Sequence, residues 1–93
     1  MIVKFTEEFH EQYKKADRRI KKSFEQRLAL FIKSPMDLQL KNHPLQREPY
    51  LGQRSINITS DYRAIYKEVI LEDNNYIYFT AFGTHEELYN KKR

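Results

Sequence analysis

Hydrophobic residues in the first third of the chain recur every three or four positions, a period that predicts amphipathic helix. The positions that carry this period are Phe9, Tyr13, Ala16, Ile20, Phe24, Leu28 and Phe31. Thr6 and the two acids after it are typical of a helix N-cap, and Asp17 is the predicted cap of a second helix. Ser34-Pro35 ends the helical region, because proline disfavours the helical conformation in the residue before it. Residues 2–5 predict a short strand ahead of the helices.

The pattern changes after residue 35. Residues 36–53 have no period and contain Pro44, Pro49 and Gly52, so they predict a connecting loop with at most one turn of helix. Three segments rich in β-branched and aromatic residues then predict strands of an antiparallel meander, with one turn at Asp73-Asn74-Asn75. These strands are residues 54–58, 62–71 and 76–82. Gly83-Thr84 leaves the last strand, and residues 85–93 predict a short terminal helix or a frayed tail. The expected fold is α+β, with two N-terminal helices packed on a small antiparallel sheet.

The length of 93 residues predicts a single domain, 1–93, whose active site is a surface cleft. Cysteine is absent from the sequence, which excludes disulfides and thiolate metal sites and is compatible with a reducing compartment. No apolar run approaches the roughly 18 residues of a membrane span, and the first residues lack the features of a signal peptide. We therefore expect a cytoplasmic protein that does not interact with membranes.

The charge is basic, with 17 Lys and Arg against 13 Asp and Glu and a net charge of +4. This excess favours a polyanionic partner, although a solvated helix face and a solubilising tail would give the same composition. The cations predicted to bind RNA are Lys14, Lys15, Arg18, Arg19, Lys21, Lys22, Arg54, Lys91 and Lys92.

Of the three histidines, His10 lies in the helical pattern and is expected to be an ordinary surface residue. His43 lies in a turn-like setting in the aperiodic central loop and His85 lies in one just after the last strand, and catalytic groups are often found in such loops. Neither has a second histidine at metal-ligand spacing, so we expect no metal site. The chain also lacks a GxSxG elbow and a glycine-rich phosphate loop.

The remaining candidates suit cleavage of RNA without a metal or other cofactor. This reaction needs a base for the 2′-hydroxyl, an acid for the departing 5′-oxygen, and a cation for the phosphate. The chain offers candidates for all three: His43 and His85 for the base and the acid, with Asp61 beside them in the set, and Arg63 for the cation. The alternative reading makes Arg63 an exposed strand residue, and Tyr62, Tyr66 and Tyr89 packing residues.

A set of short motifs in the second half resembles the YafQ-like branch of the RelE/ParE toxin superfamily. The resemblance covers about the last 50 residues, and the first 40 match only as the expected strand and helices. The motifs are Asn42-His43-Pro44-Leu45-Gln46, Gly52, Arg54, Asp61-Tyr62-Arg63-Ala64-Ile65-Tyr66-Lys67 and Gly83-Thr84-His85-Glu86-Glu87-Leu88-Tyr89.

This resemblance implies a microbial-ribonuclease-like fold with a twisted sheet, whose concave face holds the active site. It implies a toxin of a type II toxin–antitoxin system that cleaves mRNA in the ribosomal A site and is neutralised by a cognate antitoxin. On this basis His43 and His85 would be acid and base in either order, and Asp61 would orient or charge one of them. Arg63 would stabilise the pentacoordinate phosphate, and Tyr89 would stack on a base.

Two positions depart from the pattern of the branch. Asn57 stands where a further histidine is expected, and Ala81 stands where arginine is frequent. Two other functions stay open: a ParE-like inhibitor of DNA gyrase without catalysis, and an RNA-binding or partner-binding module whose catalytic residues have decayed. The two turn histidines favour the nuclease, because the ParE branch lacks them.

Overall fold

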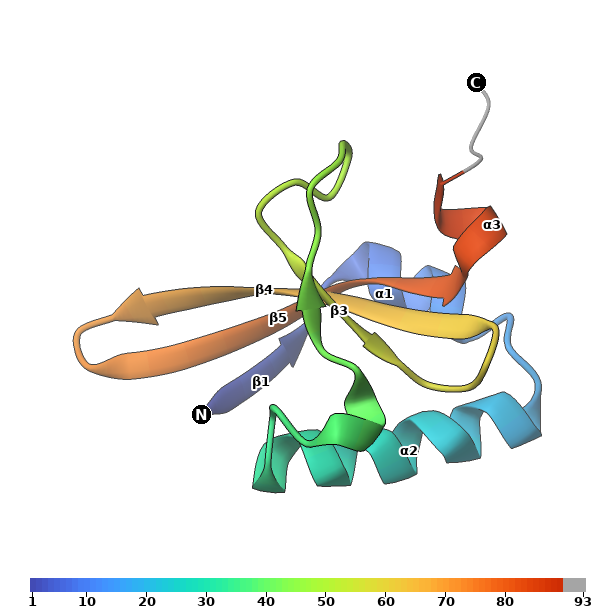
Figure 1. Ribbon diagram of the computed structural model, residues 1–93, viewed down its shortest axis with the longest axis horizontal. Coiled ribbons are helices and arrows are strands. Elements are labelled where there is room, and N and C mark those ends of the chain that lie inside the picture. Colours follow the sequence, from blue (N-terminus) through green and yellow to red (C-terminus); the bar gives the residue numbers. More distant parts are fainter. Residues whose placement is uncertain (90–93) are drawn as a thin grey trace.

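The computed structural model describes residues 1–89 and arranges three α-helices around one five-stranded sheet (Figure 1). In chain order the elements are β1 (Ile2–Phe5), α1 (Glu7–Tyr13), α2 (Arg18–Lys33), the 3₁₀ turn η1 (Leu38–Leu40), β2 (His43–Pro44), β3 (Arg54–Asn57), β4 (Tyr62–Leu71), β5 (Asn74–Thr84) and α3 (His85–Tyr89). No helix within residues 1–89 has the length and apolar character to cross a membrane.

The two N-terminal helices begin at the predicted caps. The Thr6 side chain accepts a hydrogen bond from the Phe9 amide at 3.2 Å, and the Asp17 carboxylate accepts one from the Ile20 amide at 3.0 Å. Each bond satisfies an amide that has no partner inside the helix. α2 ends at Lys33, just before Ser34-Pro35. The break at Asp17 and the stop at the proline are both confirmed.

The sheet has the order β1-β5-β4-β3-β2, in which β3, β4 and β5 form the expected antiparallel meander and β2 adds a further antiparallel strand at its edge. β1 lies parallel to β5, with Ile2 opposite Tyr76, so the α+β class is confirmed and the sheet is mixed. The β4–β5 turn falls at Glu72 and Asp73, earlier than predicted, because both adopt positive φ (49° and 71°) in a two-residue hairpin. β5 also continues through Thr84, which pairs with Tyr62.

Hydrophobic side chains cover both faces of the sheet. The helix-side core joins both N-terminal helices to one face, and α2 runs along this face in Figure 1. Its buried members are Phe9, Phe24, Phe31, Leu40, Ile56, Ile58, Ala64, Tyr66, Ile77, Phe79 and Phe82. The loop-side cluster covers the opposite face and consists of Tyr50, Ile65, Ala81 and Leu88, with Leu45 and Tyr89 packed against it. This second cluster attaches the loop after β2 and α3 to the sheet.

The segment predicted as a loop contains the single turn η1, as expected, and one element that was not expected. His43 and Pro44 form a two-residue edge strand, with His43 opposite Ser55. Lys41 makes this possible, because its left-handed conformation (φ 49°) reverses the chain after η1. Pro44 is compatible with this position, since an edge strand leaves one side unpaired.

Candidate active site

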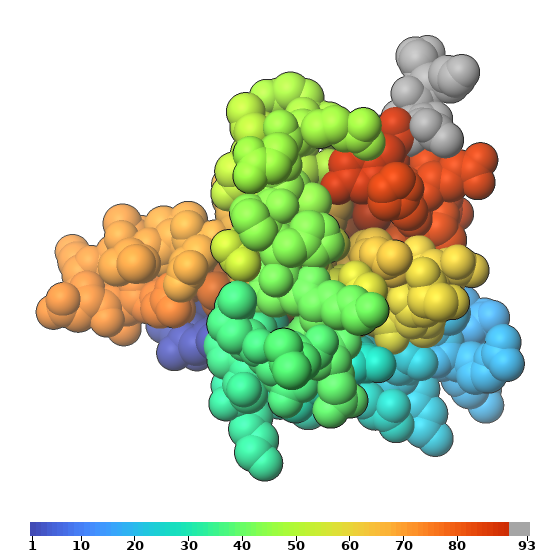
Figure 2. Space-filling model, in the orientation of Figure 1, coloured from blue at the N-terminus to red at the C-terminus, as the bar shows by residue number. Residues whose placement is uncertain are grey.

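Four of the five predicted catalytic residues line one surface pocket of about 170 Å³. They are His43, Arg63, His85 and Tyr89. β2 and β4 supply two of these side chains and α3 supplies the other two, so the pocket joins parts of the chain that lie far apart in sequence. Figure 2 shows the segment after β2, coloured green, beside α3, coloured red. The pocket lies on the sheet face opposite α2.

His43 is held by its own chain. Its Nδ1 lies 2.8 Å from the Lys41 carbonyl oxygen, which can only accept a hydrogen bond, so Nδ1 carries the hydrogen. In the neutral ring Nε2 is then an acceptor, the form that a general base requires. The short strand β2 fixes the backbone of this histidine against β3. The expectation that His43 lies in an aperiodic loop is therefore wrong.

α3 carries His85 and Tyr89 on adjacent turns, with ring centroids 4.7 Å apart. A capping box begins this helix: the Glu87 amide donates to the Thr84 hydroxyl at 3.1 Å, and the Thr84 amide donates to the Glu87 carboxylate at 2.9 Å. Leu88 is 1% exposed and attaches the helix to the loop-side cluster. These contacts fix both site residues relative to the end of β5.

Among the residues that the structure describes, three side chains lie against the Tyr89 ring. His85 is one, the Tyr50 ring meets it edge-on with centroids 5.5 Å apart, and the guanidinium carbon of Arg47 lies 5.2 Å from its centroid. Burial raises the pKa of Tyr89 above its ordinary value of 10.0, and the positive charge of Arg47 opposes this rise. The phenol is therefore protonated at neutral pH and can donate a hydrogen bond.

Arg63 lines the pocket but is partly committed to the β3–β4 turn. Its Nη1 donates to the carbonyl oxygens of Thr59, Ser60 and Tyr62 at 3.0, 3.1 and 3.1 Å. Because Nη1 has two hydrogens for three acceptors, this end of the guanidinium has none left for a phosphate. Nε and Nη2 supply its remaining donors.

Asp61 is the one predicted catalytic residue that does not line the histidine pocket. It is exposed and lines a neighbouring surface depression together with His85 and Glu86. The link between Asp61 and His85 is a backbone hydrogen bond, in which the His85 amide donates to the Asp61 carbonyl at 3.2 Å. His85 therefore lies between the pocket and the Asp61 carboxylate.

Within residues 1–89, the basic residues predicted to bind RNA lie outside the pocket. Six of them occupy the end of α1, the turn after it and the start of α2, and five of these six are exposed. Lys14 forms an exposed ion pair with Glu11 at 3.1 Å, and Lys21 lies over the Tyr13 ring. The Nε of Arg54 donates to the Asn42 side chain at 2.8 Å. Residues Lys91 and Lys92 lie outside the described part of the chain.

The two departures from the family pattern have different surroundings. Asn57 pairs with Arg63 across β3 and β4, and among the described residues its buried Oδ1 has no hydrogen-bond partner. Ala81 is 1% exposed beneath Leu88 and Tyr50. An arginine at residue 81 would need the space that these two apolar side chains occupy.

Sequence reasoning missed two residues that line the pocket, Arg47 and Ser55. Ser55 is buried and lies opposite His43 in the β2–β3 pair, so only knowledge of β2 would have revealed it. Arg47 comes four residues after His43 in a segment without periodicity. Its sequence context contains no signal that distinguishes it from other surface cations.

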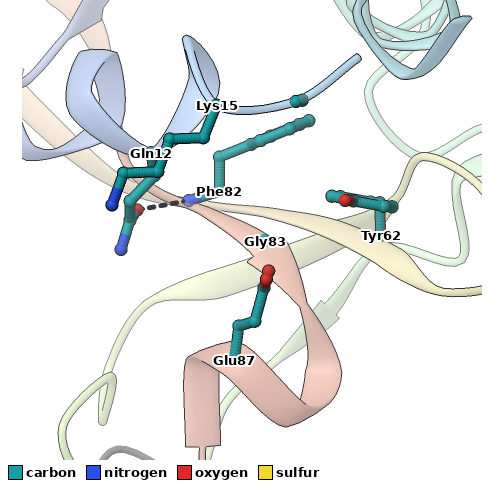
Figure 3. Close-up of a pocket in the computed structure, with 7 residues that line it drawn as sticks. Gln12, Lys15, Tyr62, Phe82, Gly83 and Glu87 are labelled. Atoms are coloured by element: carbon teal, nitrogen blue, oxygen red, sulfur yellow. Dashed lines mark hydrogen bonds between the residues drawn. The ribbon is translucent and has the colours of Figure 1, made fainter.

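A second pocket of about 220 Å³ lies between α1, the end of β5 and α3 (Figure 3). Two of its polar lining groups already have partners: the Gln12 side-chain oxygen accepts from the Phe82 amide at 2.8 Å, and Glu87 belongs to the capping box. A Cβ added at Gly83 would lie 3.0 Å from the Glu87 carboxylate, so a larger residue would press on the capping box. We interpret this pocket as part of the support for α3.

Within residues 1–89, no three His, Cys, Asp or Glu side chains form a group that could hold a metal ion. The histidine pocket contains only two such side chains. Metal independence of the reaction stays a prediction.

Comparison with known proteins identifies the class. The model of the ParE toxin of type II toxin–antitoxin systems (parDE) matches residues 3–89. The chain is therefore a type II toxin and belongs to the ParE toxin family. No curated protein sequence gives a significant match.

Solved structures extend this assignment. YafQ from E. coli strain BL21(DE3) superposes with a TM-score of 0.73 and 26% identity, covering 94% of this chain and 96% of that chain. The toxin in the E. coli DinJ–YafQ toxin–antitoxin complex gives 0.71 and 26%, covering 94% of each chain. The YoeB/ParE toxin from Agrobacterium tumefaciens gives 0.71 at 18% identity, covering 91% and 99%, and so shows the fold alone. The chain is YafQ-like within the RelE/ParE superfamily.

Proposed function

We propose that this toxin is a metal-independent endoribonuclease that cleaves mRNA in the ribosomal A site. The observation that supports this function is the pocket in which His43 and His85 meet beside Arg63 and Tyr89. Two imidazoles and a cation at one concave site provide the acid, the base and the charge that phosphodiester cleavage needs. The likeness to YafQ favours the same reading.

In this mechanism His43 is the base and His85 is the acid. The Nδ1–H of His43 is held by the Lys41 carbonyl, which leaves Nε2 to take the proton from the 2′-hydroxyl. The 2′-oxygen forms a bond to phosphorus, and the bond from phosphorus to the 5′-oxygen breaks. Protonated His85 donates its proton to the departing 5′-oxygen. The products are a 2′,3′-cyclic phosphate and a 5′-hydroxyl.

The other site residues support this step. Arg63 offers Nε and Nη2 to the phosphate, and Asp61, whose backbone carbonyl accepts a hydrogen bond from the His85 amide, helps to orient His85. Tyr89 packs beside the reacting nucleotide, where stacking on an unpaired base contributes about 1 to 3 kcal/mol. For a base to reach this ring, Arg47 or His85 must move aside.

The proposed setting is the cytoplasm, with the ribosome and its mRNA as the target. We also propose that a cognate antitoxin neutralises the toxin, as the DinJ–YafQ complex illustrates for YafQ. The net charge of +4 favours an acidic antitoxin segment that orders on binding and covers the histidine pocket.

A second candidate function is non-catalytic inhibition of DNA gyrase. The match to the ParE toxin family favours this function, because the sequence analysis left open a ParE-like inhibitor of gyrase. This function needs neither histidine, so the two candidates make opposite predictions for histidine variants. The third alternative, a binding module whose catalytic residues have decayed, predicts that the protein neither cleaves mRNA nor inhibits gyrase.

One paired assay separates these candidates. The toxin is incubated with translating ribosomes in excess chelator at an ion concentration that keeps the ribosomes intact, and separately with supercoiled DNA and gyrase. We expect cleaved mRNA with 2′,3′-cyclic phosphate ends and normal gyrase turnover. Inhibition of gyrase with intact mRNA would refute the ribonuclease function and support gyrase inhibition. Cleavage of mRNA that is lost in chelator and returns only with one divalent ion would refute metal independence.

The chain supplies a matched control for the histidine variants. His10 is exposed on α1, contacts the Phe5 ring and lines neither of the two pockets described above. His10→Ala should therefore cleave at the wild-type rate, whereas His43→Ala should not. Equal loss in both variants would indicate a general effect of removing histidine and would contradict the proposed roles.

A further inference from the structure

We propose that Arg47 binds the scissile phosphate, a role that rests on the proposed ribonuclease function. Arg47 lines the same pocket as His43 and His85. It lies in the segment after β2, which lies beside α3 in Figure 2. The site would then hold two arginines with different tasks, one on the sheet and one on the loop.

The Arg47 side chain has the donors that a phosphate requires. Within residues 1–89 no hydrogen bond or ion pair engages its guanidinium, which contacts the face of the Tyr89 ring. A guanidinium over an aromatic face is held by cation–π attraction, which engages none of its N–H groups in a hydrogen bond. All five donors of Arg47 are therefore available for a bidentate contact with phosphate oxygens.

Arg63 is less suited to be the principal phosphate ligand. Its Nη1 holds the carbonyls of the β3–β4 turn, and the Thr59 hydroxyl in the same turn accepts from the Asp61 amide at 3.2 Å. Arg63 thus positions the turn that precedes β4. Its removal should change the geometry of the whole edge of the site as well as the charge.

The backbone that carries Arg47 is fixed even though its side chain is exposed. The Tyr50 amide donates to the Arg47 carbonyl at 3.0 Å, and Tyr50 itself is 7% exposed in the loop-side cluster. At the base of the loop the Leu45 amide donates to the Gln53 carbonyl at 2.8 Å. The side chain can move from Tyr89 to a phosphate without rearrangement of the loop.

The test compares Arg47→Ala, Arg47→Lys and Arg63→Ala with a charge-matched control, Arg27→Gln. Arg27 lies on α2, on the opposite face of the sheet, where Nη1 donates to the Gln39 carbonyl. Each variant is assayed by single-turnover cleavage of ribosome-bound mRNA. The free proteins are also titrated with a nucleoside 3′-monophosphate and with the nucleoside alone, using the imidazole NMR signals of His43 and His85.

Arg47→Ala should slow cleavage about 10²- to 10³-fold, the usual effect of removing one group that stabilises developing charge. It should also bind the nucleotide no better than the nucleoside. Arg47→Lys should recover part of both losses, because charge returns without the planar fork. Arg27→Gln should match the wild type. Arg63→Ala should lower thermal stability in addition to rate.

The proposal would be overturned if Arg47→Ala cleaved at the wild-type rate and kept the wild-type preference for the 3′-phosphate. It would also be overturned if Arg27→Gln lost as much activity as Arg47→Ala, because the cause would then be the net charge. If the wild-type toxin cleaves no mRNA, the ribonuclease function fails, and the nucleotide titration then decides alone whether Arg47 binds phosphate. The two failures are therefore distinguishable.

Discussion

Replacement of Leu88 by alanine should detach α3 from the sheet and slow RNA cleavage without unfolding the domain. Leu88 is 1% exposed and is the buried residue of a five-residue helix that carries His85 and Tyr89. It packs in the loop-side cluster, apart from the larger helix-side core. The substitution therefore weakens a local attachment of the site rather than the main core.

The expected magnitudes support local detachment. A buried leucine replaced by alanine costs about 2–5 kcal/mol. The capping box of Thr84 and Glu87 contributes about 0.5–2 kcal/mol, and each aromatic contact of Tyr89 about 0.5–1.5 kcal/mol. The loss is thus comparable to everything else that holds α3, whereas a domain of this size is stable by about 5–15 kcal/mol. If α3 detaches, the rest of the domain stays folded. The free energy of unfolding then falls by no more than the free energy that attaches α3 in the wild type.

The assay combines hydrogen exchange, chemical denaturation and single-turnover cleavage. For Leu88→Ala we expect fast exchange at the amides of α3, unchanged protection in β4 and β5, and a cleavage rate at least tenfold lower. Ile77→Ala is the matched control, because Ile77 is 2% exposed in the helix-side core, away from the pocket. It should lose about 2–5 kcal/mol of global stability and cleave normally while folded. Protected α3 amides with slow cleavage in Leu88→Ala would refute this reasoning.

Three further predictions concern the site and its pH dependence. His43→Ala and His85→Ala should each slow cleavage about 10²- to 10⁴-fold with ribosome affinity nearly unchanged, and a loss below about tenfold would mean that the residue is peripheral. Asn57→Ala should leave the melting temperature unchanged or raise it, because it removes a buried oxygen without a partner in the described chain; a clearly lower value would show that the amide stabilises the fold. Burial raises the pKa of Tyr50 and Tyr62 above 10.0, so their contribution to stability is complete below pH 10.0 and is lost as the pH rises through the folded pKa values. Tyrosinate absorbance that titrates below pH 10.0 for these two residues would contradict this.

Local sequence signals were enough to predict the helices and most of the sheet. Thr6 and Asp17 cap their helices through side chains three residues from the amides they satisfy, and proline ends α2 by a clash with its neighbour. Such signals act over a few residues, so they can be read from the chain. The parallel pairing of β1 with β5 joins residues more than seventy positions apart and has no local signal.

The candidate site was predictable only in part, for the same reason. The motifs indicated His43, His85 and Tyr89, and the structure brings these three together in one pocket. Arg47 enters that pocket only because the loop-side cluster holds its loop against α3. The hydrogen bonds that commit Arg63 to the β3–β4 turn depend on the conformation of the turn, which the sequence did not specify.

The position of β5 in the sheet affects when the toxin can first become active during its own synthesis. β5 is the last strand to be translated, yet it lies between β1 and β4 and leads directly into His85. A nascent chain that lacks β5 cannot join β1 to the sheet, and it has neither α3 nor the acid of the proposed mechanism. Folding therefore depends on contacts between the two ends of the chain, which form late and slowly. On the proposed mechanism, an incomplete chain therefore cannot cleave the mRNA of the ribosome that is making it.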